Sequence, residues 1–353
     1  MTTRKKKVIA LAMVLVVTIG ILALLQELLM PKYMSGIYEG AMIAEYYDDS
    51  ENHNIVFVGD CEIYENISPV TLWEEYGLTS YMRGSAQQLI WQSYYLLEET
   101  LQYEKPDVVV FNVLSMKYGE PQDEAYNRMT LDGMKLSMSK INSIKASMME
   151  DESFLSYIFP LLRYHSRWSD LTSEDFEYLF HRDKVTFSGY LMRADVKPLG
   201  TVPSAPILGD YTFSENSYKY LDMMVELCKE NGVELVLMKA PSVYPFWYDE
   251  WDAQMEEYAK EHGLMYVNFL DSIEEIGIDF ETDTYDAGLH LNVYGAEKLA
   301  SYFGEILVEN FEFTDYASDT EIQKHWQEIT EAYNAEKKKQ EELFKEYGYL
   351  KGY

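Results

Sequence analysis

Three residues that could carry acyl-transfer chemistry occupy two short stretches of the chain. Cys61 follows the apolar run NIVFV at residues 54–58, after a Gly-Asp turn, and Asp286 and His290 lie in the segment DAGLHLN. A thiol attacks an ester carbonyl as the thiolate when a histidine takes its proton, and a carboxylate can hold that histidine in the required tautomer. These residue types predict a Cys-His-Asp site.

Donors for a developing oxyanion are expected at the ends of neighbouring strands. Gly84 and Ser85 follow a short predicted strand, and Asn112 lies near the end of the run DVVVFNV. Ligands of open parallel sheets bind beyond the carboxyl ends of the strands, so these residues should meet Cys61 at one edge. We expect the backbone N–H groups of Cys61 and Gly84 and the amide of Asn112 to act as donors. Losing one such donor typically slows a reaction about 100- to 1000-fold.

The elements that must position these residues alternate along the chain. Strands are predicted at 54–58, 79–82, 107–113, 233–238 and 265–269, and helices at 69–76, 86–103, 218–230, 252–262 and 295–308. Apolar strands that alternate with helices are typical of a parallel sheet covered on both faces. We therefore predict a three-layer α/β/α domain with about five parallel strands. The mostly helical, Met-rich and aromatic residues 121–210 interrupt this rhythm, and we interpret them as an insertion that covers the strand ends.

The N-terminus predicts the compartment. Four consecutive cations at residues 4–7 precede residues 8–25, which contain no charged side chain, and the apolar character continues to residue 30. About 20 apolar residues cross a bilayer, whereas the apolar core of a cleavable signal peptide is usually about 7–15 residues long and ends at a small-x-small site. We favour an uncleaved single-pass anchor over a signal peptide. The cationic flank would stay in the cytoplasm, with the bulk of the chain extracytoplasmic.

The expected organisation follows from these segments. It consists of a basic cytoplasmic segment at 1–7, the transmembrane anchor at 8–30, a juxtamembrane stalk at 31–50, the α/β domain at 51–313 and a charged helical tail at 314–353. The tail has an amphipathic pattern without Gly or Pro in its long body, and we interpret it as a solvated helix that packs one face on the domain.

Composition excludes some functions. With 60 acidic and 29 basic residues the formal net charge is −31, and such a surface repels nucleic acid. Neither Cys61 nor Cys228 lies at zinc-ligand spacing from another Cys or His, so we expect no metal and no cofactor. Cys228 lies in an amphipathic helical stretch and is interpreted as a buried apolar residue.

The order of these blocks resembles the SGNH/GDSL hydrolase family over roughly residues 51–310. VFVGDCEIYENISP resembles the nucleophile block with Cys61 in place of serine, and MRGSAQQ resembles the block that supplies an oxyanion glycine. VVVFNVLSM matches the asparagine block by position but lacks its usual Gly-x-Asn-Asp context. Asp286-x-x-x-His290 is one residue longer than the family's Asp-x-x-His, and it continues into Asn292 and YGAEKLA.

This resemblance implies an SGNH/flavodoxin-like fold with Cys61, His290 and Asp286 as catalytic residues. The anchor and the insertion make the chain similar to the membrane-anchored extracytoplasmic branch of the family, which modifies envelope polymers. The implied activity is ester hydrolysis or O-acyl transfer on an envelope polysaccharide or a teichoic-acid-like polymer. The implied partner is a multispanning membrane O-acyltransferase.

Several assignments stay open. Cys61 could mark a site that has lost catalysis, which would leave a non-catalytic glycan-binding or assembly protein, and Ser85 is the next candidate nucleophile. Asp283 or a backbone carbonyl could orient His290 in place of Asp286. Supporting roles are possible for three further residues: Asp60, Ser85 and Asn292.

The lengthened Asp286–His290 spacing requires a bulge in the loop. Gly288 is best able to absorb that turn because glycine tolerates positive φ. We predict that the Asp286 carboxylate still bonds the His290 nitrogen that faces away from Cys61.

Three basic residues in FPLLRYHSRWSDLT stand out in so acidic a chain: Arg163, His165 and Arg167. They are possible substrate-binding residues for an anionic polymer group. The preferred interpretation is that they pair internally with carboxylates.

Overall fold

A five-stranded parallel sheet forms the centre of the computed structural model, which describes residues 3–31, 39–49, 52–181, 184–202 and 204–352. The strand order is β2-β1-β3-β4-β5, which is the doubly wound order of flavodoxin-like folds. The strands are β1 (Ile55–Gly59), β2 (Ser80–Gly84), β3 (Val108–Asn112), β4 (Glu234–Lys239) and β5 (Met265–Asn268). The predicted three-layer α/β/α class with about five parallel strands is confirmed.

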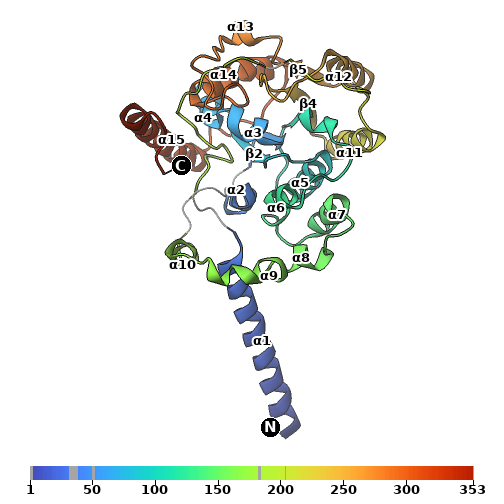
Figure 1. Cartoon of the computed structure of the whole chain (residues 1–353), viewed down its shortest axis with the longest axis vertical. Coiled ribbons are helices and arrows are strands. Elements are labelled where there is room, and N and C mark those ends of the chain that lie inside the picture. The colour runs from blue at the N-terminus through green and yellow to red at the C-terminus, as the bar shows by residue number, and fades with distance from the viewer. Residues whose placement is uncertain (1–2, 32–38, 50–51, 182–183, 203, 353) are drawn as a thin grey trace.

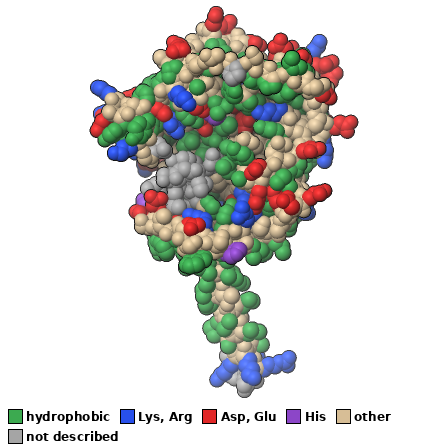
Figure 2. Space-filling model, viewed as in Figure 1, with side chains coloured by type: hydrophobic (Ala, Val, Ile, Leu, Met, Phe, Trp, Pro, Cys, Tyr) green, Lys and Arg blue, Asp and Glu red, His purple; other side chains and the backbone are tan. Residues whose placement is uncertain are grey.

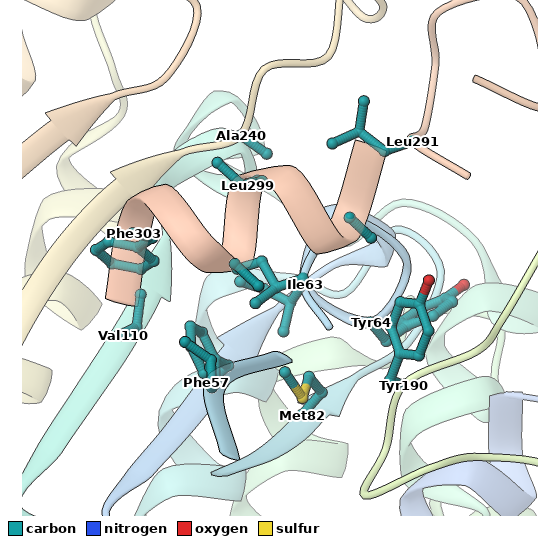
Figure 3. Packing of buried hydrophobic residues seen from close by; sticks show 14 of the residues in the cluster. Phe57, Ile63, Tyr64, Met82, Val110, Tyr190, Ala240, Leu291, Leu299 and Phe303 are labelled. Carbon is teal, nitrogen blue, oxygen red and sulfur yellow. The ribbon is translucent and has the colours of Figure 1, made fainter. Parts of the chain in front are cut away.

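Helices cover both faces of this sheet (Figure 1). One face carries α3 (Cys61–Asn66), α4 (Pro69–Tyr76) and α14 (Val293–Asn310), and the other carries α5 (Ile90–Tyr103), α11 (Glu215–Asn231) and α12 (Asp249–His262). Successive strand side chains point to opposite faces, so Phe57 packs towards α14 while Val56 and Val58 pack towards α5 and α11. Figure 3 shows Phe57 and Val110 below Leu299 and Phe303.

Helix ends follow local sequence signals. Ser68 caps α4 by accepting a hydrogen bond from the Thr71 N–H, and α4 ends at Gly77, whose φ of 69° a residue with a side chain rarely adopts. The same pair of signals, Ser214 and Gly232, bounds α11.

The segment between β3 and β4 splits into two parts. Its first part holds the short helices η2 (Val113–Lys117), α6 (Glu124–Leu131), α7 (Met138–Ser147), α8 (Phe154–Ile158), α9 (Leu161–Tyr164), η3 (His165–Ser169) and α10 (Ser173–Tyr178). Helices α8, α9 and α10 lie at the foot of the domain in Figure 1. Its described second part is largely extended, and Leu191 N–H and Lys197 N–H donate to the carbonyls of Tyr64 and Thr284. Helical sequence therefore fills only the first part of 121–210, and the extended part is the one that runs beside the loop of His290.

The N-terminal helix α1 (Thr3–Leu29) projects from the foot of the domain (Figure 1). An 18-residue apolar window within it has a mean hydropathy of 3.1 and is not buried by the rest of the protein. By length and composition this helix fits a membrane anchor or a signal sequence. Part of the stalk predicted at 31–50 lies outside the described residues. Its later residues form α2 (Glu39–Glu45) and η1 (Tyr46–Asp48), which bury Ile43 and Tyr46 in the domain.

The C-terminal helix α15 (Thr320–Tyr347) packs one face against the domain. Trp326 stacks on Trp73 of α4 with ring centroids 5.4 Å apart, and Tyr333 is buried beside Tyr190. Its other face is exposed, as the amphipathic pattern indicates. The remaining short helix, α13 (Ile273–Ile276), follows β5.

Candidate active site

Cys61 is the first residue of α3 and follows β1 after a single residue, Asp60. The Asp60 carboxylate accepts a hydrogen bond from the Glu62 N–H at 3.1 Å and so caps the helix. Gly84 of β2 lies against this turn, because a Cβ there would come within 3.1 Å of the carbonyl oxygens of Gly59 and Asp60. The thiol is thus held at the carboxyl end of the sheet on a tightly packed strand–helix turn.

The structure brings His290 and Asp286 together despite the lengthened spacing. Asp286 Oδ2 lies 2.7 Å from His290 Nδ1, and Oδ1 accepts the His290 backbone N–H at 2.8 Å. The loop between them bulges at two residues, Ala287 with φ of 68° and Gly288 with φ of 93°. Sequence reasoning named only Gly288. One carboxylate therefore fixes both the backbone and the ring of His290.

The residues around this loop have structural contacts of their own. The Asp283 carboxylate bonds Lys298 Nζ at 2.6 Å and the Asp279 N–H at 2.8 Å. Asn292 caps α14 through Oδ1, and its Nδ2 donates to the carbonyls of Asp195 and Thr282. In this arrangement Asp286, and not Asp283, contacts the histidine.

A second carboxylate, which the sequence reasoning missed, also reaches the ring. Glu65 Oε2 lies 3.2 Å from His290 Nδ1, and both side chains are only 7% exposed. Glu65 also accepts a very short hydrogen bond from the Tyr285 hydroxyl. A signal was present in the sequence, since Glu65 lies four residues after Cys61, the spacing that places two side chains on one face of a helix.

The thiol and the imidazole act on each other. Among the described residues His290 Nε2 is buried without a hydrogen bond of regular geometry, but the Cys61 side chain is close enough to affect the ring both by charge and as a hydrogen-bond partner. Such contacts are often loose before substrate binds. Burial raises the pKa of the Cys61 thiol, although His290 opposes this. Burial lowers the pKa of His290, but the nearby groups, with the Glu65 carboxylate first among them, outweigh burial and hold this pKa well above its usual value.

The predicted oxyanion amide is already engaged in this structure. Asn112 Nδ2 donates to Asp60 Oδ1 at 3.0 Å and to Glu62 Oε2 at 2.8 Å, which uses both of its hydrogens. Lys239 at the end of β4 bonds both oxygens of Glu62 at 2.8 and 3.0 Å. Burial, with help from the Glu62 charge, raises the pKa of Asp60 to about 6. Asn112 can therefore serve an oxyanion only if one of these carboxylates moves.

Four of the residues singled out in the sequence are engaged elsewhere. The buried Ser85 hydroxyl bonds Gln88 and Thr130. Arg163 pairs with Glu124, and His165 Nδ1 lies 3.0 Å from the carbonyl oxygen of Leu162. Arg167 bonds the carbonyls of Leu29 and Met30 and pairs with Asp175. Arg163 and Arg167 thus pair with carboxylates of the same chain, as the preferred interpretation of these basic residues predicts.

Three side chains at the site are of types that can bind a metal ion. Glu65, Asp286 and His290 each place one potential ligand atom within 4.8 Å of the others. Two carboxylates and an imidazole are a donor set that several divalent metals accept. His290 Nδ1 also lies 2.7 Å from Asp286 Oδ2 and 3.2 Å from Glu65 Oε2. These distances equally fit hydrogen bonds that orient the imidazole ring and stabilise its protonated form.

Comparison with known proteins gives little beyond this geometry. No protein-family model matches the chain, and no curated protein matches it. Among solved structures, a Desulfitobacterium hafniense protein assigned to the lipolytic G-D-S-L family is 13% identical, with 72% of this chain and 100% of that one covered and a TM-score of 0.35. A Bacteroides fragilis protein assigned as an acylhydrolase is 12% identical over 80% of this chain and 100% of that one, with a TM-score of 0.38. At such scores neither likeness bears on the chemistry, which is argued from the site itself.

Proposed function

We propose that this chain is an ester hydrolase or O-acyltransferase that acts on a cell-envelope glycopolymer through Cys61, His290 and Asp286. The observation that carries the proposal is the placement of a thiol on a strand–helix turn next to a histidine whose Nδ1 lies 2.7 Å from a carboxylate. Two segments far apart in the sequence supply the three groups. Their roles match those of the generalised triad, in which Cys61 attacks, His290 moves the proton and Asp286 orients the histidine.

In the proposed reaction His290 Nε2 accepts the thiol proton as the sulfur of Cys61 attacks the ester carbonyl. The tetrahedral intermediate collapses when the C–O bond breaks, and the imidazolium returns the proton to the leaving alcohol. The resulting thioester on Cys61 is then attacked by water or by a sugar hydroxyl, whose proton His290 takes and passes to the departing thiolate. Asp286 holds the ring and stabilises its charged form throughout.

The site would face the exterior of the cell on the anchor formed by α1. The cationic residues before the helix favour a cytoplasmic N-terminus. An envelope polysaccharide or a teichoic-acid-like polymer as substrate, and a multispanning membrane O-acyltransferase as partner, follow from the family resemblance and form part of the proposal. The strongly acidic composition argues against a nucleic-acid substrate.

A second candidate is a non-catalytic glycan-binding or assembly protein of the same fold. The engagement of Asn112 with two carboxylates favours it, because a working oxyanion hole needs a donor free to meet the developing charge. The raised pKa of the Cys61 thiol also favours it, because the thiol is the weaker nucleophile.

The two candidates are separated by the fate of an activated ester. The full chain, purified in detergent, should hydrolyse an aryl acetate and gain one acetyl group on Cys61, detected by mass spectrometry of the intact protein. Cys61→Ala should lose both signals, with a fall in kcat of at least about 10³-fold. Cys228→Ala serves as the matched control, because Cys228 is buried in α11 and only 1% exposed.

The possible results assign the function directly. Unchanged turnover in Cys61→Ala would show that the nucleophile lies elsewhere. A folded wild-type protein that binds glycan but neither cleaves nor acquires the acyl group would favour the second candidate.

A further inference from the structure

Exposed apolar side chains gather at the foot of the domain, where α1 leaves it. Figure 2 shows hydrophobic surface there in continuity with the projecting helix. Helices α9, α10 and η3 all contact α1. Trp168 is 72% exposed and Phe180 is 89% exposed. We call the following residues the collar: Leu136, Phe159, Leu162, Trp168, Phe176 and Phe180.

The collar lies beside the outer turns of the apolar helix. A groove of about 800 Å³ is lined by Ile19 and Leu22 of α1 on one side and by Phe159 and Leu162 on the other. Residues 8–29 span roughly 33 Å at about 1.5 Å per residue, close to the ~30 Å of a hydrocarbon core. If α1 crosses a bilayer, Ile19 lies about 15 Å below the end of the helix. The part of the collar that lines this groove is therefore level with the outer leaflet.

Arg167 fixes the collar to the helix. Its Nη1 donates to the carbonyl oxygens of Leu29 and Met30, each at 3.0 Å, and its Nη2 bonds Asp175 at 2.9 Å. The last carbonyls of a helix have no partner within it, so a guanidinium at this point satisfies them. The height of the foot relative to α1 is thereby set by hydrogen bonds.

Two stretches of the foot carry cations without acidic residues. Residues 133–149 and 153–169 contain five cations and no Asp or Glu, whereas the residues between them, 150–152, and helix α10 each contain three acidic residues. Lys135 and Arg163 are exposed there. Apolar side chains combined with exposed cations are typical of surfaces that lie in the membrane interface and tolerate anionic lipids.

We propose that the collar is a lipid-contacting surface that seats the domain on the outer leaflet, with the groove beside α1 filled by acyl chains of bilayer lipids. The inference rests on the proposed anchoring by α1 and does not depend on the chemistry of Cys61. The seat holds the catalytic domain at a fixed height and orientation above the membrane. Its substrate is then presented close to the membrane surface.

Trp168 allows a direct test, because it is the one tryptophan of the collar among the six in the chain. The full chain is reconstituted in phosphatidylcholine and phosphatidylglycerol vesicles at high lipid-to-protein ratio. The lipids are brominated either near the glycerol backbone or near the chain end. We expect brominated lipid to quench part of the tryptophan fluorescence, more strongly with the shallow label, and Trp168→Phe to lose that quenching completely. Trp247→Phe, a change just before α12 and remote from α1, is the matched control and should keep it.

Contrary results separate the two proposals. If the protein floats with the vesicles but Trp168 is quenched by aqueous iodide and not by lipid, the collar proposal is overturned and the anchor stands. If Trp168 is shielded from both quenchers, a second copy covers the collar, and the proposal is overturned as well. If the full chain does not float with vesicles, the anchor fails and the collar proposal fails with it.

Discussion

Replacing Glu65 with glutamine should move the pH dependence of the site by a measurable amount. Glu65 Oε2 lies 3.2 Å from His290 Nδ1, and both side chains are 7% exposed, so water screens the contact little. At an effective dielectric constant of about 20, two unit charges at this separation interact by about 5 kcal/mol, which is a ceiling for this contact. A nearby carboxylate usually shifts a pKa by about 1–3 units.

The expected direction follows from the role of His290 as a base. Glu65 is the largest cause that raises the pKa of His290, so the neutral ring that accepts a proton is populated only above that raised pKa. Glu65→Gln keeps the shape and most hydrogen bonds but removes the charge. The acid limb of kcat/KM should therefore move to lower pH, and at pH values below the wild-type limb the variant should be the faster enzyme.

The assay combines kinetics with an NMR titration, which does not depend on catalytic turnover. The rate of aryl acetate hydrolysis is measured across pH, and the ring protons of His290 are followed by NMR titration, assigned with His290→Gln. Glu309→Gln, a change of an exposed glutamate at the end of α14, is the control and should leave both curves in place. Coincident curves for wild type and Glu65→Gln, with the Asp286 contact intact, would refute the electrostatic role assigned to Glu65.

Two further predictions follow from individual contacts. Asp286→Asn should lower kcat on aryl acetate by about 10³- to 10⁴-fold, whereas Asp283→Asn should alter kcat little because Asp283 bonds Lys298; the reverse order would transfer the orienting role to Asp283. Lys239→Met should lower the free energy of unfolding by about 3–5 kcal/mol, since it leaves the buried Glu62 carboxylate without its cation. The double variant Lys239→Met/Glu62→Gln should recover most of this in urea unfolding of the full chain in detergent, and equal losses in both variants would contradict the ion-pair explanation.

The sheet was predictable because its signals are local. Runs such as VVVF at residues 108–111 are buried on both faces and are rich in β-branched residues, and Gly232 and Gly263 end helices in the left-handed conformation that glycine adopts readily. The placement of candidate residues at strand ends follows from the topology of parallel sheets. The contact between Asp286 and His290 was also predictable, because only three residues separate them in the sequence.

What the sequence did not reveal depends on contacts between distant segments. Glu65 meets His290 across 225 positions of the chain, and Lys239 reaches Glu62 across 177. A single sequence does not show that Asn112 gives its amide hydrogens to carboxylates, because their positions depend on the packing of α3 on the sheet. The path of the extended residues after α10 was missed for another reason. The described part of that stretch contains Pro198 and Pro206, which disrupt helical periodicity and leave its course to tertiary contacts.

The charge balance of the site indicates how the proposed chemistry would begin. With His290 protonated and both Glu65 and Asp286 ionised, forming a thiolate on Cys61 would place a third negative charge around one buried cation. Burial raises the pKa values of both the Cys61 thiol and the Glu65 carboxyl, so burial opposes a further negative charge in this cluster. To receive the thiol proton at Nε2, His290 must be the neutral ring that keeps its proton on Nδ1, beside Asp286 and Glu65. The transfer then forms an imidazolium and a thiolate together, and the net charge of the cluster does not change. Because these groups titrate together, the pH profile reports the cluster as a unit. Within the proposed mechanism, Glu65 therefore stabilises the imidazolium that forms when Cys61 loses its proton.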